Sequence, residues 1–335
     1  MPNSDIDTVT VRRSLPNVMD EFDLIDRFFR KGVGPRDDVL LGIGDDAAVV
    51  SMPEGQRLVI ASDSLIAGTH FPDQTPAHAL GYRCLAVNLS DLAAMAAQPL
   101  WATLALSMPA VDADWLRAFA EGFFKSAADA EVALVGGDTV RGPMSMTVTV
   151  HGCVELGRHV ARTGAAVGDR IYVTGTVGDA RAGLDVLLHK QSKSGPNDKL
   201  LQRFLYPSPR VTPGRQLAGI ASAMIDVSDG LHDDLGKLLH ASGLGADLDL
   251  AAVPVSEELQ CFAGADVALE LALTGGDDYE LCFTISPDNE SQLAQLAEHW
   301  DCAATCIGEV SSEIEARWWR DGHRHAVGNP AFSHF

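Results

Sequence analysis

Basic residues and long apolar runs are scarce in this sequence, and each scarcity excludes a class of function. Lysine and arginine number 25 against 46 aspartates and glutamates, which gives a net charge of −21. A polyanion repels nucleic acid and anionic membrane surfaces, so neither is expected as a partner. No stretch approaches the roughly 20 apolar residues of a membrane span. Residues 1–20 are polar and lack the apolar core of a signal peptide. We therefore expect a cytoplasmic protein.

Cysteine is present but is not arranged for disulfide or zinc chemistry. The six cysteines include no CxxC pair, and four of them lie in apolar, strand-like segments. Cys302 and Cys306 are four residues apart, without the neighbouring histidines that a zinc site would need. We expect reduced thiols, most of them buried.

Strand-like and helix-like segments alternate along the chain and predict an α/β (α+β) protein with two domains. Strands are expected at 57–63, 101–109, 132–138, 145–155, 222–230, 246–254, 269–285 and 304–310, and helices at 21–31, 77–99, 113–130, 213–222, 231–242 and 290–300. The predicted organisation is a loosely ordered polar tail (1–20), an N-terminal domain (21–156) and a C-terminal α/β domain (157–335).

Strands in both halves end in glycine and aspartate. The pattern occurs as "GIGDD" at 42–46, "GGD" at 136–138, "SDG" at 228–230 and "GGDD" at 275–278. Glycine at a strand end lets a ligand approach the backbone. Aspartate there can also be a simple turn former that bonds its own backbone. The repetition of the pattern favours a functional role.

The first of these motifs resembles a dinucleotide fingerprint without being one. "GIGDDA" satisfies G-x-G-x-x-G/A, but the segment that follows, "AAVVSMPEG", is β-like and opens no helix. The acidic pair would also face a pyrophosphate directly. The sequence contains no G-x-x-x-x-G-K-[ST] P-loop, and "DVSDGLHDD" lacks the spacing and final glutamate of an EF-hand loop.

A magnesium cluster explains the aspartates better. Mg²⁺ prefers oxygen ligands and commonly bridges one or two carboxylates to substrate phosphates. Bound cations would relieve the repulsion between neighbours such as Asp45 and Asp46. Asp91 strengthens the case, because it lies in the apolar helical segment "LAVNLSDLAAMAAQ", on one face with Asn88. A buried aspartate is costly unless it is paired or metal-bound, although an arginine or backbone partner would also satisfy it.

Together, these motifs resemble the thiamine-monophosphate kinase family of the aminoimidazole-ribonucleotide-synthetase-like superfamily, over roughly residues 20–335. The superfamily is marked by "NLSD", "GGDT" and a late "DxSDG", and the family by "SDSLIAGTHF", "GGDTVRGP" and "GGDDYEL". Further matching segments are "EFDLIDRFF", "LGIGDDAAVV", "ARTGAAVGDRIYVTGTVGDARAGL" and "PSPR".

The resemblance implies Mg²⁺-dependent transfer of the γ-phosphoryl group of ATP to thiamine monophosphate, giving thiamine diphosphate and ADP. It leaves a role for K⁺ open. Because the acceptor oxygen is already anionic, no general base is expected, and catalysis would rest on alignment and charge neutralisation. Asp63, Asp91 and Asp138 are expected to matter most. The implied fold has two domains with mixed sheets, and the N-terminal sheets of a homodimer would form a barrel-like interface. The alternating, β-branched strand at 145–155 is a candidate for that interface.

The resemblance also assigns site residues. The implied metal ligands are Asp46, Ala61 (through its backbone oxygen), Ser62, Asp63, Asp91, Asp138, Asp226 and Asp229. The implied ATP contacts are Gly137, Asp138, Arg162 and Ser228, with Arg162 pairing with a phosphate. The implied substrate contacts are His70, Asp277 and Phe332. The family commonly has glutamate in place of Asp277, so this side chain is one methylene shorter.

Three alternatives are less consistent with the sequence. Selenophosphate synthesis would use a reactive N-terminal cysteine, and the first 83 residues contain none. The purine-pathway ligase of the superfamily would be expected to lack "AGTHF" and "GGDDYEL". A non-catalytic acidic metal-binding protein would explain neither the glycine-rich strand ends nor Arg162. The segment "TGTVGDARAGL" leaves two readings open: helix N-terminal amides near an anion, or an ordinary strand–helix turn.

Overall fold

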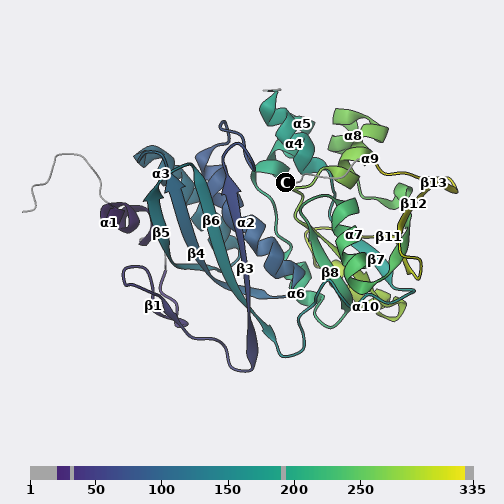
Figure 1. Ribbon diagram of the computed structural model, residues 1–335, viewed down its shortest axis with the longest axis horizontal. Helices are drawn as coiled ribbons and strands as arrows, with labels where there is room; N and C mark the ends of the chain where they lie inside the picture. Colours follow the sequence, from purple (N-terminus) through teal and green to yellow (C-terminus); the bar gives the residue numbers. More distant parts are fainter. Residues whose placement is uncertain (1–20, 31–33, 190–193, 329–335) are drawn as a thin grey trace, which may run out of the picture.

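The computed structural model describes residues 21–30, 34–189 and 194–328 (Figure 1). The predicted tail (1–20) and Phe332 lie outside these residues. Across the described ranges, strands and helices form two mixed sheets with helices against them, which confirms the expected mixed α/β fold class. None of the helices in these ranges is long and apolar enough to cross a membrane.

The N-terminal half is built on a four-stranded sheet of order β3-β6-β4-β5. Its strands are β3 (Gln56–Ile66), β4 (Gln98–Met108), β5 (Ala133–Arg141) and β6 (Ser145–Glu155). β6 runs antiparallel to β3 and β4, whereas β4 and β5 are parallel. Before the sheet come α1 (Glu21–Leu24), the π-helical turn η1 (Ile25–Phe29) and a short hairpin, β1 (Val39–Leu41) with β2 (Val49–Val50).

Two helices, α2 (Ala77–Ala94) and α3 (Ala113–Asp129), cover one face of this sheet (Figure 1). α3 begins where the side chain of Asp112 accepts hydrogen bonds from the amides of Asp114 and Trp115, a standard N-cap. The opposite face of the sheet carries exposed apolar side chains, among them Leu58 and Ile60 of β3. An uncovered apolar face of this kind indicates a surface that another molecule can cover.

The C-terminal half is a seven-stranded sheet of order β13-β12-β9-β11-β7-β10-β8. Its strands are β7 (Arg170–Thr174), β8 (Ala221–Val227), β9 (Gly245–Asp249), β10 (Glu280–Ile285), β11 (Ala304–Ser311), β12 (Ala316–Arg320) and β13 (His323–His325). Its helices are α4 (Asp179–Leu188), α5 (Pro196–Leu205), α6 (Val211–Gln216), α7 (Leu231–Ser242), α8 (Glu257–Ala263), α9 (Ala265–Thr274) and α10 (Glu290–Ala297), with short turns η3 (Leu250–Ala252) and η4 (Pro287–Asn289).

Two predicted strands are wrong in part. In the segment 246–254, strand β9 ends at Asp249 and the turn η3 follows it. The segment 269–285 begins as helix α9, and only its end forms strand β10. The run "ADVALELALT" is rich in the helix formers alanine and leucine, and it buries Ala268, Ala272 and Leu273 on one side. An apolar run this short does not by itself distinguish a strand from a buried helix.

Helix α2 lies at the junction of the two halves. Most of its residues are buried, and its apolar side chains are spread around the whole helix among a few polar ones. Leu85 and Leu89 belong to the core shared with the N-terminal sheet. Ala93 belongs to a second core, together with Met224 of β8 and Phe283 of β10. An all-round apolar helix requires cover on every face, and here each half of the chain supplies part of it.

Candidate functional site

Polar residues of α2 bond to both halves of the chain. The amide of Asp63 on β3 donates to Oδ1 of Asn88 over 2.8 Å. The hydroxyl of Ser90 donates to Oδ2 of Asp226 on β8, also over 2.8 Å. Asn88 and Ser90 are both buried. The helix therefore fixes a strand of the N-terminal sheet and a strand of the C-terminal sheet relative to Asp91.

Three carboxylates influence one another at this junction. Burial, followed by the negative charges of Asp226 and Asp63, raises the pKa of Asp91 to about 7. Burial raises the pKa of Asp226 to about 6. Burial also raises the pKa of Asp63. The guanidinium of Arg162 opposes the shift at Asp91 and at Asp226. In the junction group (Asp63, Asp91, Arg162 and Asp226), burial thus disfavours the charged form of each carboxylate, and Arg162 partly offsets this at Asp91 and Asp226.

The loop after β8 carries a fourth carboxylate, that of Asp229. Asp234, buried in α7, accepts hydrogen bonds from the amides of Ser228, Asp229 and Gly230 at 2.9, 2.8 and 3.2 Å. Asp229 pairs with Lys237, which also contacts Asp234 at 2.7 Å. The negative charge of Asp229 reaches Asp63, where it raises the pKa. The loop carrying Ser228 and Asp229 is therefore held in place beside the junction group.

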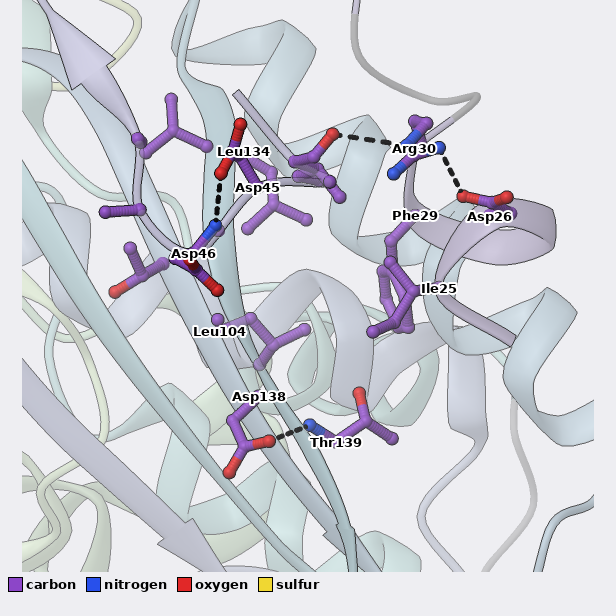
Figure 2. Close-up of a pocket in the computed structure, with 18 of the residues that line it drawn as sticks. Ile25, Asp26, Phe29, Arg30, Asp45, Asp46, Leu104, Leu134, Asp138 and Thr139 are labelled. Atoms are coloured by element: carbon purple, nitrogen blue, oxygen red, sulfur yellow. Dashed lines mark hydrogen bonds and ion pairs between the residues drawn. The ribbon is translucent and has the colours of Figure 1, made fainter. Parts of the chain in front are cut away.

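A separate cavity of about 490 Å³ lies beside β5. Asp46 and Asp138 line one side of it, and Ile25 and Phe29 of the first helical turns line the other (Figure 2). Oδ1 of Asp45 accepts the amide of Asp46 at 2.9 Å, which is a local turn bond. Oδ1 of Asp138 accepts the amide of Thr139 at 2.8 Å in the same way, so a local bond of this kind leaves each carboxylate a second oxygen. Asp46 and Asp138 are the candidate ligands at this cavity.

Gly137, next to Asp138, cannot be replaced without strain. Its φ is +148°, and a Cβ at this position would lie 1.9 Å from the carbonyl oxygen of Leu104 on β4. Only glycine fits such a close backbone approach. The glycine of "GGDT" therefore has a steric reason, the close approach of β5 to β4 at this point.

The cavity group (Asp46, Gly137 and Asp138) is distant from the junction group within one chain. β3 and β5 are the opposite edges of the four-stranded sheet, three strand spacings or about 14 Å apart. Asp63 faces α2, and the strand register places Asp138 on the other face of the sheet. Among the residues that the structure describes, no three His, Cys, Asp or Glu side chains are arranged as a metal site.

Ser62 and Asp63 also face opposite sides of the sheet, as neighbours on a strand must. The hydroxyl of Ser62 contacts Oγ1 of Thr149 at 2.9 Å and donates to the carbonyl of Val148 at 3.2 Å. Ala61 lies on the same face as Asp63. Asp63 is therefore the residue of 61–63 whose side chain can bring an oxygen to the junction group. Ala61 has no side-chain oxygen and the hydroxyl of Ser62 lies on the other face, so their backbone oxygens are the candidate ligands.

The substrate-side residues are placed as follows. Nδ1 of His70 accepts the amide of Ile66 at 3.0 Å. Asp277 has a left-handed backbone (φ +64°), and its carboxylate accepts hydrogen bonds from Arg83 and Tyr279. Phe332 lies beyond the described residues.

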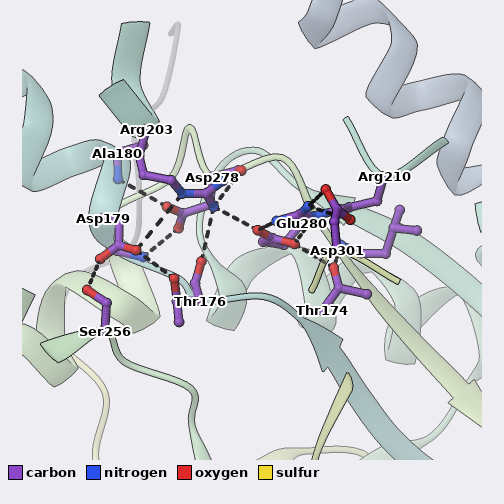
Figure 3. Close-up of polar contacts among 12 residues, drawn as sticks. Thr174, Thr176, Asp179, Ala180, Arg203, Arg210, Ser256, Asp278, Glu280 and Asp301 are labelled. Atoms are coloured by element: carbon purple, nitrogen blue, oxygen red, sulfur yellow. Dashed lines mark hydrogen bonds and ion pairs between the residues drawn. The ribbon is translucent and has the colours of Figure 1, made fainter. Parts of the chain in front are cut away.

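The residues that follow Asp277 are structural. Asp278 is buried and accepts the amides of Gly178 and Ala180 at 2.6 and 3.2 Å (Figure 3). The N-terminal amides of α4, which one reading of "TGTVGDARAGL" places near an anion, thus bond to the protein's own Asp278 carboxyl, whose pKa burial raises to about 8. Glu280 bonds Arg203 and Arg210 in the same network.

Arg83, Asp234 and Lys237 do not figure in the sequence-based site. The sequence did carry a signal for two of them, since the spacing of "SDGLHDDLGK" places Asp234 one helical turn inside α7 and Lys237 at i+3 from it. Arg83 had no comparable local signal, because its partners lie on α5 and in the turn before β10, more than a hundred residues away.

Comparison with known proteins relates the whole chain to one family. The models for AIR synthase related proteins match it, the N-terminal domain over 44–154 and the C-terminal domain over 166–318. The thiamine-monophosphate kinase of Escherichia coli (strain K12) is 46% identical over 319 residues, 94% of this chain and 98% of that protein.

Two solved structures agree over most of the chain. A thiamine-monophosphate kinase from Stenotrophomonas maltophilia K279a superposes with a TM-score of 0.85 at 44% identity, covering 92% of this chain and 98% of the other. A structure described as AaThiL complexed with AMPPCP and TMP has a TM-score of 0.74 at 30% identity, covering 94% and 97%.

Proposed function

This chain belongs to the thiamine-monophosphate kinase family, and from that premise we propose that it transfers the γ-phosphoryl group of ATP to thiamine monophosphate. The bond from the γ-phosphorus to the β–γ bridging oxygen breaks, and a bond to a phosphate oxygen of thiamine monophosphate forms. The products are ADP and thiamine diphosphate. The observation that carries the proposal is the junction group, in which Asp63, Asp91, Asp226 and Arg162 gather where α2 meets both halves of the chain.

Both substrates are anions, and the protein is itself strongly anionic. Phosphoryl transfer between them depends on cations that neutralise and align the phosphates. The elevated pKa values of Asp91 and Asp226 fit a site that is complete only with added positive charge. Arg162 supplies one such charge, and we assign it to a phosphate of ATP.

Mg²⁺ suits the donors present. They are carboxylate oxygens, and Mg²⁺ is usually held by one or two of them together with waters and substrate phosphates, so a preformed three-carboxylate cage is not needed. We propose Asp63, Asp91, Asp226 and Asp229 as ligands at the junction, and Asp46 and Asp138 at the cavity. When bound, Mg²⁺ would neutralise charge on the transferring phosphates. Added K⁺ can be tested in the same assay.

We also propose a cytoplasmic homodimer with domains at 21–156 and 157–335. The exposed apolar face of the four-stranded sheet would pack against its copy in a barrel-like interface. Such a dimer would resolve the separation of the two carboxylate groups, if each active site took the junction group from one copy and the cavity group from the other.

Coupled measurement of ADP release tests the activity. The chain should release ADP with ATP, Mg²⁺ and thiamine monophosphate, and none with free thiamine, which has no acceptor phosphate. Asp63→Ala and Asp138→Ala should each abolish turnover in a folded protein, whereas Asp129→Ala, an exposed residue paired with Lys125, should not. Normal turnover in the first two variants would remove the site assignment.

Mixing inactive variants tests the shared site. Asp91→Asn and Asp138→Asn change the junction group and the cavity group respectively. If the two groups come from different copies, a heterodimer of the variants carries one intact site and one doubly altered site, so mixing restores activity. If both groups serve within one copy, every site in the mixture is defective and no activity returns.

A further inference from the structure

Arg83 is buried, and both terminal nitrogens of its guanidinium donate hydrogen bonds. It lies on α2 and is 1% exposed. Nη1 donates to the carbonyl of Phe204 at 2.6 Å, and Nη2 donates to Oδ1 of Asp277. The rings of Phe204 and Tyr279 lie 4.6 and 5.6 Å from the guanidinium carbon. Two aromatic rings and two hydrogen-bond acceptors thus hold the guanidinium in this position.

The partner of Arg83 is a carboxylate on a strained turn. Asp277 and Tyr279 both have left-handed backbones, with φ of +64° and +53°. Their amides donate to the carbonyls of Ser228 and Val227, each over 2.8 Å, so the turn lies against the loop that carries Asp229. Non-glycine residues held in this conformation cost free energy, and such positions concentrate at functional sites.

The two oxygens of Asp277 differ in their surroundings. Oδ1 accepts hydrogen bonds from both Arg83 and the hydroxyl of Tyr279, the latter over 3.0 Å. Oδ2 accepts none from the residues that the structure describes, and the side chain is 30% exposed. The turn therefore presents one carboxylate oxygen outward while the other is held from behind.

Stability alone does not account for this arrangement. Nε of Arg83 is buried and has no hydrogen-bond partner in the described part of the chain. Burying a guanidinium with an unsatisfied donor is costly, and an apolar side chain of similar volume commonly serves a core equally well. Asp277, being partly exposed, could be solvated without a partner. What Arg83 adds is a fixed position and orientation for the carboxylate.

We propose that Arg83 is a positioning residue for the thiamine-monophosphate substrate, acting through Asp277; this rests on the proposed function. Thiamine monophosphate carries a permanent positive charge on its thiazolium ring, and the outward Oδ2 of Asp277 is a suitable counter-charge. Arg83 and Asp91 lie two turns apart on α2, about 12 Å along its axis. One rigid helix thus sets the spacing between the substrate-side carboxylate and the metal-side carboxylates.

Steady-state kinetics on Arg83→Met, Asp277→Asn and the double variant test the proposal. The KM for thiamine monophosphate should rise about tenfold or more in each single variant, because the counter-charge of the thiazolium ring is removed or displaced, while the KM for ATP stays within about twofold. The double variant should be no worse than either single one, because the two residues act as a unit. Arg117→Met, which removes an exposed arginine paired with Asp114, serves as the control.

Two results would overturn the positioning role. One is an unchanged KM for thiamine monophosphate in Arg83→Met. The other is a parallel rise in both KM values with a lowered melting temperature, which would indicate a structural role only. A wild-type protein that releases no ADP with thiamine monophosphate would instead refute the proposed function, so the two failures are distinguishable.

Discussion

Glu280 offers the sharpest stability test in the molecule. Its side chain is fully buried and accepts hydrogen bonds from Arg203 at 2.7 Å, from Arg210 at 2.6 Å and from Thr174 at 2.6 Å (Figure 3). Glu280→Gln keeps the size of the side chain but removes its charge. Two arginines, largely buried, then lose their shared counter-ion. Breaking a buried ion pair in this way costs about 3–5 kcal/mol.

Urea unfolding followed by circular dichroism measures the loss of free energy of unfolding, and thermal melts of the same variant measure the fall in melting temperature. For a unit of the size of the C-terminal half, 3–5 kcal/mol corresponds to a fall in melting temperature of about 6–20 °C. The matched control is Glu309→Gln, which breaks the half-exposed pair with Arg170 and should cost about 0–1 kcal/mol. If Glu280→Gln were as mild as the control, the exposed Asp301 near Arg210 would have to be the effective counter-ion, and the reasoning about burial would be refuted.

Two further predictions concern the site. Gly137→Ala should lower the free energy of unfolding by about 1–3 kcal/mol, because its Cβ would lie 1.9 Å from a backbone carbonyl oxygen. The control is Gly136→Ala, whose Cβ would lie 3.9 Å from its nearest neighbour and which should change the free energy of unfolding by at most about 0.5 kcal/mol. Equal urea midpoints for the two variants would contradict this prediction. Burial raises the pKa of Asp91 to about 7 and that of Asp226 to about 6, from an ordinary value of 3.8. Between pH 3.8 and about 7 the native state therefore binds more protons than the unfolded state. The free energy of unfolding without Mg²⁺ should fall as the pH rises through this range. Saturating Mg²⁺ should reverse that fall. A melting temperature that changes neither with pH nor with added Mg²⁺ would argue against a metal site at the junction.

Much of the fold could be predicted because the local pattern was strong. The alternation in 145–155 and the periodicity in 231–242 gave β6 and α7 at their observed bounds. Prediction failed where local pattern was ambiguous. The short apolar run before "GGDDYEL" fits the pattern of a buried strand, but α9 forms there and packs against α4, α7 and α8.

The candidate site divides in the same way. The motifs identify each candidate aspartate. They do not predict on which face of a sheet its side chain lies. The separation of Asp63 from Asp138 depends on strand order and register, both set by pairings between distant segments. The identity of Asp91 as a junction residue was accessible, because an acidic residue in an apolar helix requires a special environment. The role of Arg83 was not, since all its partners come from the other half of the chain.

The burial of helix α2 on every side has a consequence for motion. A helix shared between two cores resists hinge bending. If the two halves of the chain opened widely, α2 would separate from one of them, and the apolar surface between them would be exposed to water. Shear, the sliding of packed layers by small steps, remains compatible with such a shared element. Entry and exit of substrates are therefore expected to depend on peripheral loops, while the distance between the two sheets stays nearly constant through the catalytic cycle.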